Sequence, residues 1–167
     1  MFGIYIDNGK GKQGYFRNFI SGGNSGFKYK LLLSDKDGAM EFMTRSVAEN
    51  KAYKILETLG ETAEATEFYN CKIQLVNFAS KSSVPWHSGS TYSLYVKSQE
   101  SEGYYVQKKV KRVEGVMIPA IVIADTPKKL YASPEAAYGV LRDLQKFLSL
   151  EGEYSASSYD FTIVPLG

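Results

Sequence analysis

The sequence contains one cysteine, one histidine and five prolines among 167 residues, and each scarcity excludes a class of protein. Cys71 has no second cysteine to pair with, so no disulfide forms within the chain, and no Cys/His set has zinc-site spacing. No apolar run approaches the roughly 18 residues of a membrane span, and MFGIYIDNGK lacks the regions of a signal peptide. We therefore expect a cytoplasmic protein with no membrane partner.

Net charge is also small, because 20 basic residues nearly balance 18 acidic ones to leave +2. The 44% of hydrophobic and 23% of charged residues are typical of a folded soluble protein. A chain of this length buries roughly 70% of its unfolded surface, so it needs no metal or disulfide to hold a core. The unusual feature is an aromatic content of 14%, with thirteen tyrosines and nine phenylalanines.

The chain repeats itself after 87 to 90 residues. Five landmarks recur in the same order, which indicates an internal duplication. The matching pairs are Gly3–Ile6 with Ser93–Val96, Gly14–Phe16 with Gly103–Tyr105, Leu31–Asp35 with Ile121–Asp125, Ser46 with Ser133, and Ile73 with Phe161. Chance similarity between β-rich segments is the alternative explanation.

Each half of the sequence predicts four short strands, a helix and a trailing strand. We therefore expect an α+β fold made by tandem duplication, with antiparallel twisted sheets and one helix per half, in one compact pseudo-symmetric body. The first repeat spans residues 1–90 and the second 91–167. The predicted strands of the first half lie near 2–6, 15–20, 27–34 and 39–44, and the trailing strands near 67–79 and 158–166. The first trailing strand continues through the loop SKSSVPWHSGS into a strand at 91–97.

Both helices have recognisable ends. Ser46 with Glu49 forms a capping box that predicts the start of the first helix, and Gly60 predicts its end. Ser133 followed by Pro134 predicts the start of the second helix. The predicted buried stripes are Ala48, Ala52, Ile55, Leu56 and Leu59 in the first helix, and Ala137, Val140, Leu141, Leu144 and Leu148 in the second.

Positive charge is concentrated at equivalent places in the two halves. Residues 1–34 carry five basic residues and one acid, and residues 103–113 carry four basic residues and no acid. Cations neutralise phosphates, and flat aromatic rings stack on unpaired bases, so the two together favour single-stranded nucleic acid. The candidate binding residues are Tyr5, Lys10, Lys12, Tyr15, Phe16, Arg17, Lys28, Lys30, Trp86, Tyr95, Tyr104, Tyr105, Lys108, Lys109, Lys111 and Arg112. Alternatively, the tyrosines are half-buried strand formers and the lysines protect strand edges.

The segment KKLYASPEAAYGVLRDLQKFL, in which a strand runs into a helix at the end of a repeated unit, resembles the PUR-repeat and Whirly-type single-stranded nucleic-acid-binding proteins. Separately, DGAMEFMTRSVAENKAYKIL with FYNCKIQLVNFASK and TYSLYV looks like part of the OB-fold single-stranded-DNA-binding proteins of tailed phages. In the PUR and Whirly families the sheet face opposite the helix carries the nucleic acid. That resemblance would implicate Tyr15, Arg17, Tyr104, Lys108 and Arg112.

Residues with catalytic chemistry do not form a recognisable set. His87 lies beside Trp86 in a Ser/Gly/Pro-rich loop, with no nucleophile and acid placed for a triad. Cys71 alternates with Ile73 and Leu75 on an apolar face, which indicates a core residue. Trp86 is either a plug over the core or an exposed stacking residue. We therefore expect no enzyme, no catalytic residue, no metal and no cofactor.

The function predicted from the sequence is sequence-independent binding of single-stranded nucleic acid, most simply DNA, with RNA also open. The alternative is a viral or accessory protein that inhibits or recruits a host protein through a Tyr-rich surface, which would act in the host cytoplasm. Exposed strand edges also allow a homodimer.

Overall fold

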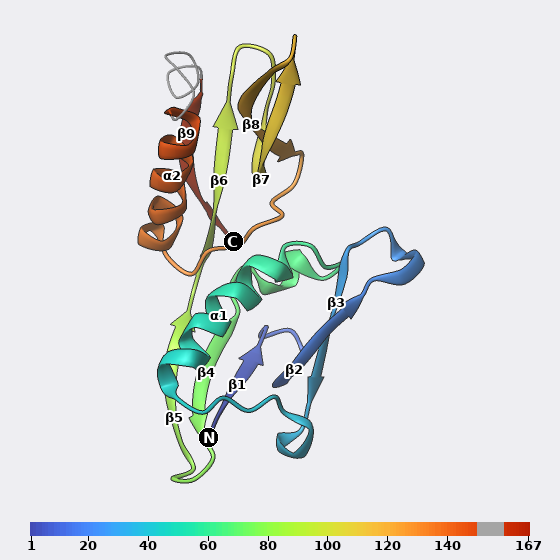
Figure 1. Cartoon of the computed structure of the whole chain (residues 1–167). Helices are drawn as coiled ribbons and strands as arrows, with labels where there is room; N and C mark the ends of the chain where they lie inside the picture. Colours follow the sequence, from blue (N-terminus) through green and yellow to red (C-terminus); the bar gives the residue numbers. More distant parts are fainter. Residues whose placement is uncertain (150–158) are drawn as a thin grey trace.

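The computed structural model describes residues 1–149 and 159–167, which form two antiparallel sheets with one α-helix against each (Figure 1). The first half contains β1 (Phe2–Asp7), β2 (Gln13–Ser21), β3 (Tyr29–Ser34), α1 (Arg45–Leu59), β4 (Lys72–Asn77) and β5 (Ser82–Ser88). The second contains β6 (Thr91–Lys97), β7 (Glu102–Val113), β8 (Val116–Ala124), α2 (Pro134–Ser149) and β9 (Asp160–Leu166). Short 3-10 turns occupy Gly23–Ser25, Lys36–Gly38 and Ala65–Phe68. The predicted α+β class is confirmed.

The two halves share one topology. The first sheet has the strand order β3-β2-β1-β4-β5 and the second β8-β7-β6-β9, so the first four strands of each correspond one to one. Local irregularities repeat as well: the β2–β3 ladder shifts register between Phe16 and Asn18, and the β7–β8 ladder between Tyr105 and Gln107. A bulge at the same place in both halves supports the predicted duplication, because bulges are specific local features.

The predicted fourth strand of each half is reduced to a single bridge. Residues 39–44 pair with β1 only at Phe2 and Phe42, and the second half repeats this with Tyr92 and Tyr131. The predicted loop after β4 is instead the strand β5, which pairs with β4 along its whole length. The first trailing strand is correspondingly shorter than expected, because residues 65–68 form a 3-10 turn.

Helix α2 begins as predicted, but α1 begins earlier. The Ser133 hydroxyl accepts the Ala136 N–H at 3.1 Å, which is the expected cap. In α1 the cap is Thr44, whose hydroxyl accepts the Val47 N–H at 3.2 Å, and Glu49 pairs with Arg45 at 2.9 Å rather than closing a capping box on Ser46. The predicted apolar stripes are buried, except that Val140 is only partly so.

Each half has its own hydrophobic core beneath its helix. Ile4, Ile6 and Phe68 lie in the first core, and Leu94 and Val96 in the second. Leu130 and Leu166 come from the second half but pack into the first core, so the two halves share a packed junction. Gly60, at the end of α1, lies against the backbone of residues 128–129 at this junction.

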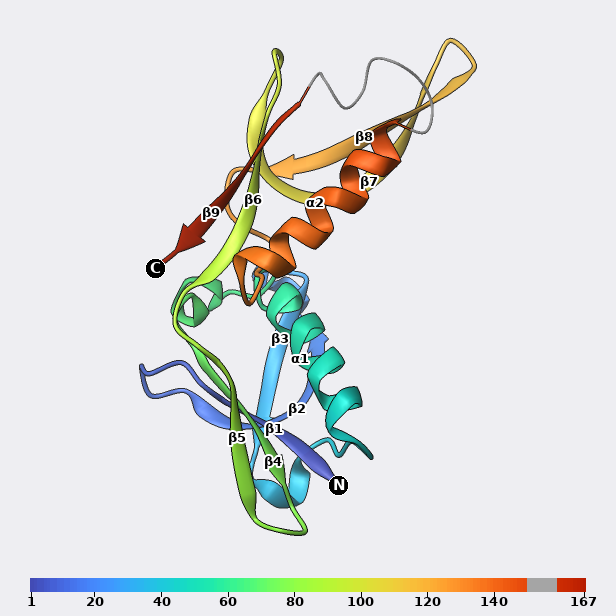
Figure 2. The ribbon, with the colours of Figure 1, turned by 90° about the vertical axis from the view of Figure 1, so that its left-hand side faces the viewer.

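The two halves are stacked end to end. Figure 2 shows the second half above the first, with β5 leading directly into β6. No helix among residues 1–149 and 159–167 is long and apolar enough to cross a membrane.

Three of the outer strands carry a proline. Pro85 lies in β5, Pro119 in β8 and Pro165 in β9. Glu114 and Gly115 form a two-residue turn with positive φ angles of 52° and 80°, so Val113 and Val116 form the hydrogen-bonded pair that closes it. Hydrogen-bonded and non-hydrogen-bonded pairs alternate along an antiparallel ladder. The Val110–Pro119 pair is the third after Val113–Val116 and is therefore not hydrogen-bonded, so the Pro119 nitrogen points away from β7.

Candidate nucleic-acid interface

The hairpin of β7 and β8 extends beyond the body of the second half (Figures 1 and 2). We call residues 107–119 of this hairpin the ribbon. Every side chain from 107 to 118 is exposed. The ribbon carries the four basic residues predicted from the sequence, Lys108, Lys109, Lys111 and Arg112.

The bulge in β7 divides these four cations between the two faces of the ribbon. Tyr104 pairs with Ala124, and beyond the bulge Lys109 pairs with Ala120 and Lys111 with Ile118. Alternation along β8 therefore places Tyr104, Lys109 and Lys111 on the same face, away from α2. We call this the open face.

Lys108 and Arg112 lie on the opposite side, which corrects the face expected from the family resemblance. The Lys108 ammonium is 5.5 Å from the centre of the Phe147 ring of α2, and Arg112 follows on the same side by alternation. The physical reason is the extra residue of the bulge, which reverses the side on which every later side chain points.

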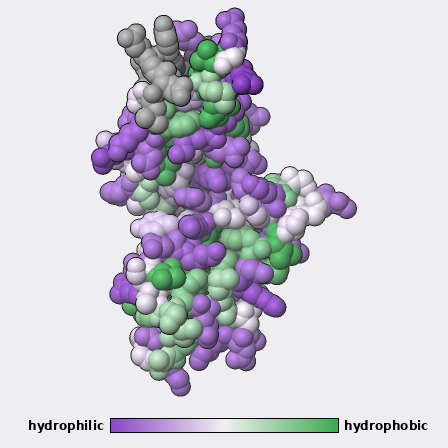
Figure 3. Space-filling view, viewed as in Figure 1, coloured by the Kyte–Doolittle hydropathy of each residue, from purple (hydrophilic) through white to green (hydrophobic). Residues whose placement is uncertain are grey.

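Ribbon cations have no carboxylate partner within 4.0 Å in the described part of the chain. The ion pairs there join Lys12 to Glu64 at 3.1 Å and Arg45 to Glu49 at 2.9 Å. The ribbon also exposes apolar side chains beside its charges, with Val116 59% and Met117 47% exposed. Figure 3 shows hydrophobic and hydrophilic atoms intermixed at this end of the molecule.

A tyrosine pair continues the open face onto the sheet. Tyr95 and Tyr104 meet edge to face, with ring centres 5.1 Å apart. The Tyr95 hydroxyl donates to a Glu102 carboxylate oxygen at 2.9 Å, and this bond raises the pKa of Tyr95. The pair is held in a fixed orientation next to the row of cations.

The first half carries the equivalent pair. Tyr5 and Tyr15 also meet edge to face at 5.1 Å, and Phe78 lies 5.5 Å from Tyr15. The Lys36 ammonium is 5.3 Å from the Phe78 ring centre. Lys36 was not among the predicted binding residues. Arg17 is exposed at the bulge beside this cluster.

Two of the predicted stacking residues are core residues instead. Phe16 is only 1% exposed and Tyr105 only 7%, because both side chains point toward the helix of their half. Buried rings cannot stack on a nucleic-acid base. The Trp86 ring packs against the first core, and its centre lies 4.8 Å from the centre of the Tyr53 ring. Of the two predicted roles, Trp86 therefore has that of a plug over the core.

The remaining predicted cations are spread over the first half. Lys10 is exposed in the β1–β2 loop, Lys12 is tied to Glu64, and the Lys28 ammonium lies 5.3 Å from the Tyr29 ring centre. Lys30 is exposed on the face of β3 away from the core. The structure therefore concentrates cations on the ribbon more strongly than on the first half.

The one cysteine and the one histidine are both buried. Burial raises the pKa of the Cys71 thiol to about 12, which keeps it protonated and unreactive. Burial lowers the pKa of His87, whose Nε2 has no hydrogen-bond partner among the residues that the structure describes. Residues 1–149 and 159–167 contain no group of three or more His, Cys, Asp and Glu placed to hold a metal.

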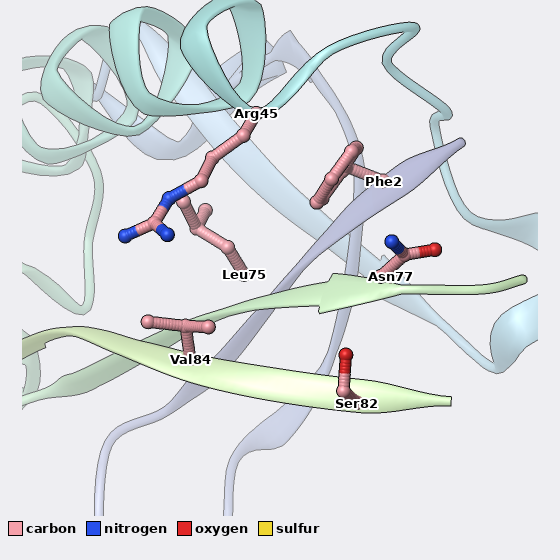
Figure 4. A pocket seen from close by; sticks show the side chains of 6 residues that line it. All are labelled: Phe2, Arg45, Leu75, Asn77, Ser82 and Val84. Carbon is pink, nitrogen blue, oxygen red and sulfur yellow. The ribbon is translucent and has the colours of Figure 1, made fainter. Parts of the chain in front are cut away.

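Pockets also lie outside the predicted site, and sequence periodicity gave no signal for them. A pocket of about 210 Å³ lies between the start of α1 and β4–β5, with Phe2, Leu75 and Val84 at its apolar side and Arg45 beside it (Figure 4). It is smaller than the roughly 300–1,000 Å³ of most ligand sites. A second pocket, of about 420 Å³, lies at the junction of the two halves and contains Glu57.

Glu57→Gln is expected to stabilise the fold at pH 7. Burial raises the pKa of Glu57 above 4.5, and this outweighs the attraction of Lys129 and Lys54. A carboxyl whose pKa is higher in the folded state destabilises that state once the pH exceeds its unfolded pKa. The gain should stay below about 1 kcal/mol, because partial exposure screens the charge. Urea unfolding should show it at pH 7 but not at about pH 3.5, where Glu57 is protonated in both states. A lower midpoint at pH 7 would contradict this.

Comparisons of the chain with protein families, curated proteins and solved structures give no match.

Proposed function

We propose that this protein binds single-stranded nucleic acid through the open face of the ribbon and the adjoining Tyr95–Tyr104 pair. The observation that carries the proposal is the single row formed by Tyr104, Gln107, Lys109 and Lys111 on β7. Its partners on β8 run from Ala124 to Ile118, so at about 3.4 Å per residue this row spans roughly 20 Å. Tyrosines and exposed cations along one track match the stacking and phosphate contacts by which proteins hold single strands without reading sequence.

The first experiment is fluorescence anisotropy of labelled single-stranded DNA, single-stranded RNA and a matching duplex, at two salt concentrations. We expect micromolar or tighter binding of a single strand that weakens with added salt, because phosphate contacts release counterions. The duplex should bind less tightly, because its paired bases cannot reach the tyrosines. No binding of any probe at low salt would overturn the proposal.

Two matched double variants test which face of the ribbon makes the contact. Lys109→Glu with Lys111→Glu changes the open face, and Lys108→Glu with Arg112→Glu changes the α2 side by the same charge. The open-face variant should lose at least about tenfold in affinity, equivalent to about 1.4 kcal/mol, and the other several-fold less. Equal losses would show that only net charge matters, and no loss in either would exclude the ribbon.

A second candidate function is the capture of a protein partner, favoured by the apolar side chains exposed on the ribbon. On this alternative Met117→Lys should weaken binding of the partner, while reversal of the cations has a smaller effect. Nucleic-acid binding that survives Met117→Lys but not reversal of Lys109 and Lys111 would favour the first function.

A further inference from the structure

The pocket at the junction of the two halves has a chemistry opposite to that of the ribbon. Its volume of about 420 Å³ lies within the roughly 300–1,000 Å³ of small-molecule sites. Tyr53 and Glu57 reach it from α1, and Tyr131, Ser133 and Glu135 from the second half. Two glutamates therefore line one cavity, and none of its lining residues within 1–149 and 159–167 is a lysine or arginine.

The carboxylate of Glu57 is incompletely compensated. Burial is the largest influence on its pKa and raises it, and no hydrogen bond contributes to the shift. Lys129 and Lys54 attract the charge but do not offset the loss of water. A partly desolvated carboxylate without a donor gains most from a charged hydrogen-bond donor that enters the pocket.

The start of α2 does not make this pocket an anion site. The Ser133 hydroxyl already accepts the Ala136 N–H at 3.1 Å, and Glu135 places a negative charge in the first turn. The positive end of the helix dipole therefore already has an anionic side chain beside it.

Aromatic and apolar groups supply the remaining walls. Tyr131 is only 4% exposed, and Glu57 is close enough to raise its pKa further beyond the effect of burial. The Tyr53 ring is held edge to face by Trp86, with ring centres 4.8 Å apart, and Val140 adds an apolar side. Aromatic rings beside carboxylates favour organic cations, because the ring face attracts positive charge.

We propose that this junction pocket binds an organic cation, with its ammonium or guanidinium group beside Glu57 and its apolar body against Tyr53 and Val140. The cation is either a free amine or the side chain of a lysine or arginine in a partner. The residues that line the pocket come from α1, from α2 and from the segment before α2, whereas the open face of the ribbon points away from α2, so the inference does not depend on the proposed function.

Isothermal titration with related probes tests the inference. Tyramine represents a free amine, and Nα-acetylarginine amide represents a side chain of a partner. The neutral 4-ethylphenol and the anionic 4-hydroxyphenylacetate share the aromatic body of tyramine. At least one cation should bind at millimolar concentration or below and about tenfold more tightly than 4-ethylphenol, with the anion weakest. The tighter of the two cations identifies the source. Absence of binding by both cations, or equal binding of cation and anion, would overturn the inference.

Variants then place the cation in the pocket. Glu57→Gln should weaken cation binding about tenfold while the fold is retained, which thermal unfolding checks. Glu100→Gln removes the same charge from an exposed loop and should leave binding unchanged. Glu135→Gln gives an independent test at the second carboxylate. Cation binding that survives both pocket variants at full strength would overturn the assignment, whatever the protein does with nucleic acid.

Discussion

Phe16→Ala is expected to remove about 3–5 kcal/mol from the free energy of unfolding, a large part of the roughly 5–15 kcal/mol that a domain has. The Phe16 ring is 1% exposed and lies 5.4 Å from the Phe19 ring. Its removal leaves a cavity that neighbouring strands cannot close, because they are held in register by the β2–β3 ladder. Urea unfolding followed by circular dichroism measures the loss.

The matched control is Tyr15→Ala, one residue earlier and on the opposite side of the sheet. Tyr15 is half-buried and touches Tyr5 and Phe78 rather than the core. It should therefore cost clearly less stability than Phe16→Ala. Similar losses for the two variants would contradict the assignment of Phe16 to the core and Tyr15 to the outer face.

Gly60→Ala is expected to destabilise the junction of the two halves by an amount near the upper end of about 1–3 kcal/mol. The φ of Gly60 is −62°, which alanine adopts without strain, so the effect isolates a collision. An added Cβ would lie 2.9 Å from the Lys129 nitrogen and closer still to the carbonyl of Lys128. All three atoms nearest to the added Cβ belong to the backbone, so no flexible side chain can move aside.

Gly139→Ala provides the control for this prediction. A Cβ at Gly139 in α2 meets nothing within 4 Å, and alanine favours a helix over glycine by roughly 1 kcal/mol. This variant should raise the thermal midpoint, whereas Gly60→Ala should lower it. A Gly60→Ala protein as stable as the original would show that the junction is not close-packed.

The helices and the repeat were predictable because they depend on patterns of many residues. Ser133 and Pro134 mark the start of α2 by local chemistry, and both apolar stripes follow helical spacing. The start of α1 was misplaced because Thr44 and Ser46 are equally good caps by sequence, and only the path of the chain from Phe42 decides between them.

Strands were harder, because their pairing depends on distant residues. The segment that became β5 contains three serines and a proline and is followed by Gly89, which indicates a loop, yet its backbone groups pair with β4. Residues 39–44 are predicted as a strand, but they pair with β1 only at the Phe2–Phe42 bridge. In each case a tertiary contact overrides the local preference.

The prediction of the candidate site was wrong about one feature, the bulge in β7. Tyr104, Lys108 and Arg112 have even spacing, so simple alternation places them on one face. The bulge after Tyr105 inserts one residue and moves Lys108 and Arg112 to the other side. Nothing in the sequence of β7 marks that position, since Val106 is an ordinary strand residue.

Pro119 has a role in what happens when two copies of this protein meet. The strand β8 reads VMIPAIVIA, nine uncharged residues on an outer edge, which is the kind of segment that recruits further strands into a growing fibril. The Pro119 nitrogen points away from β7 and carries no hydrogen, so it cannot donate a hydrogen bond to an approaching strand. Pro119 is itself buried, so its ring packs within the molecule, while the missing hydrogen lowers the tendency of the exposed ribbon to join two molecules edge to edge.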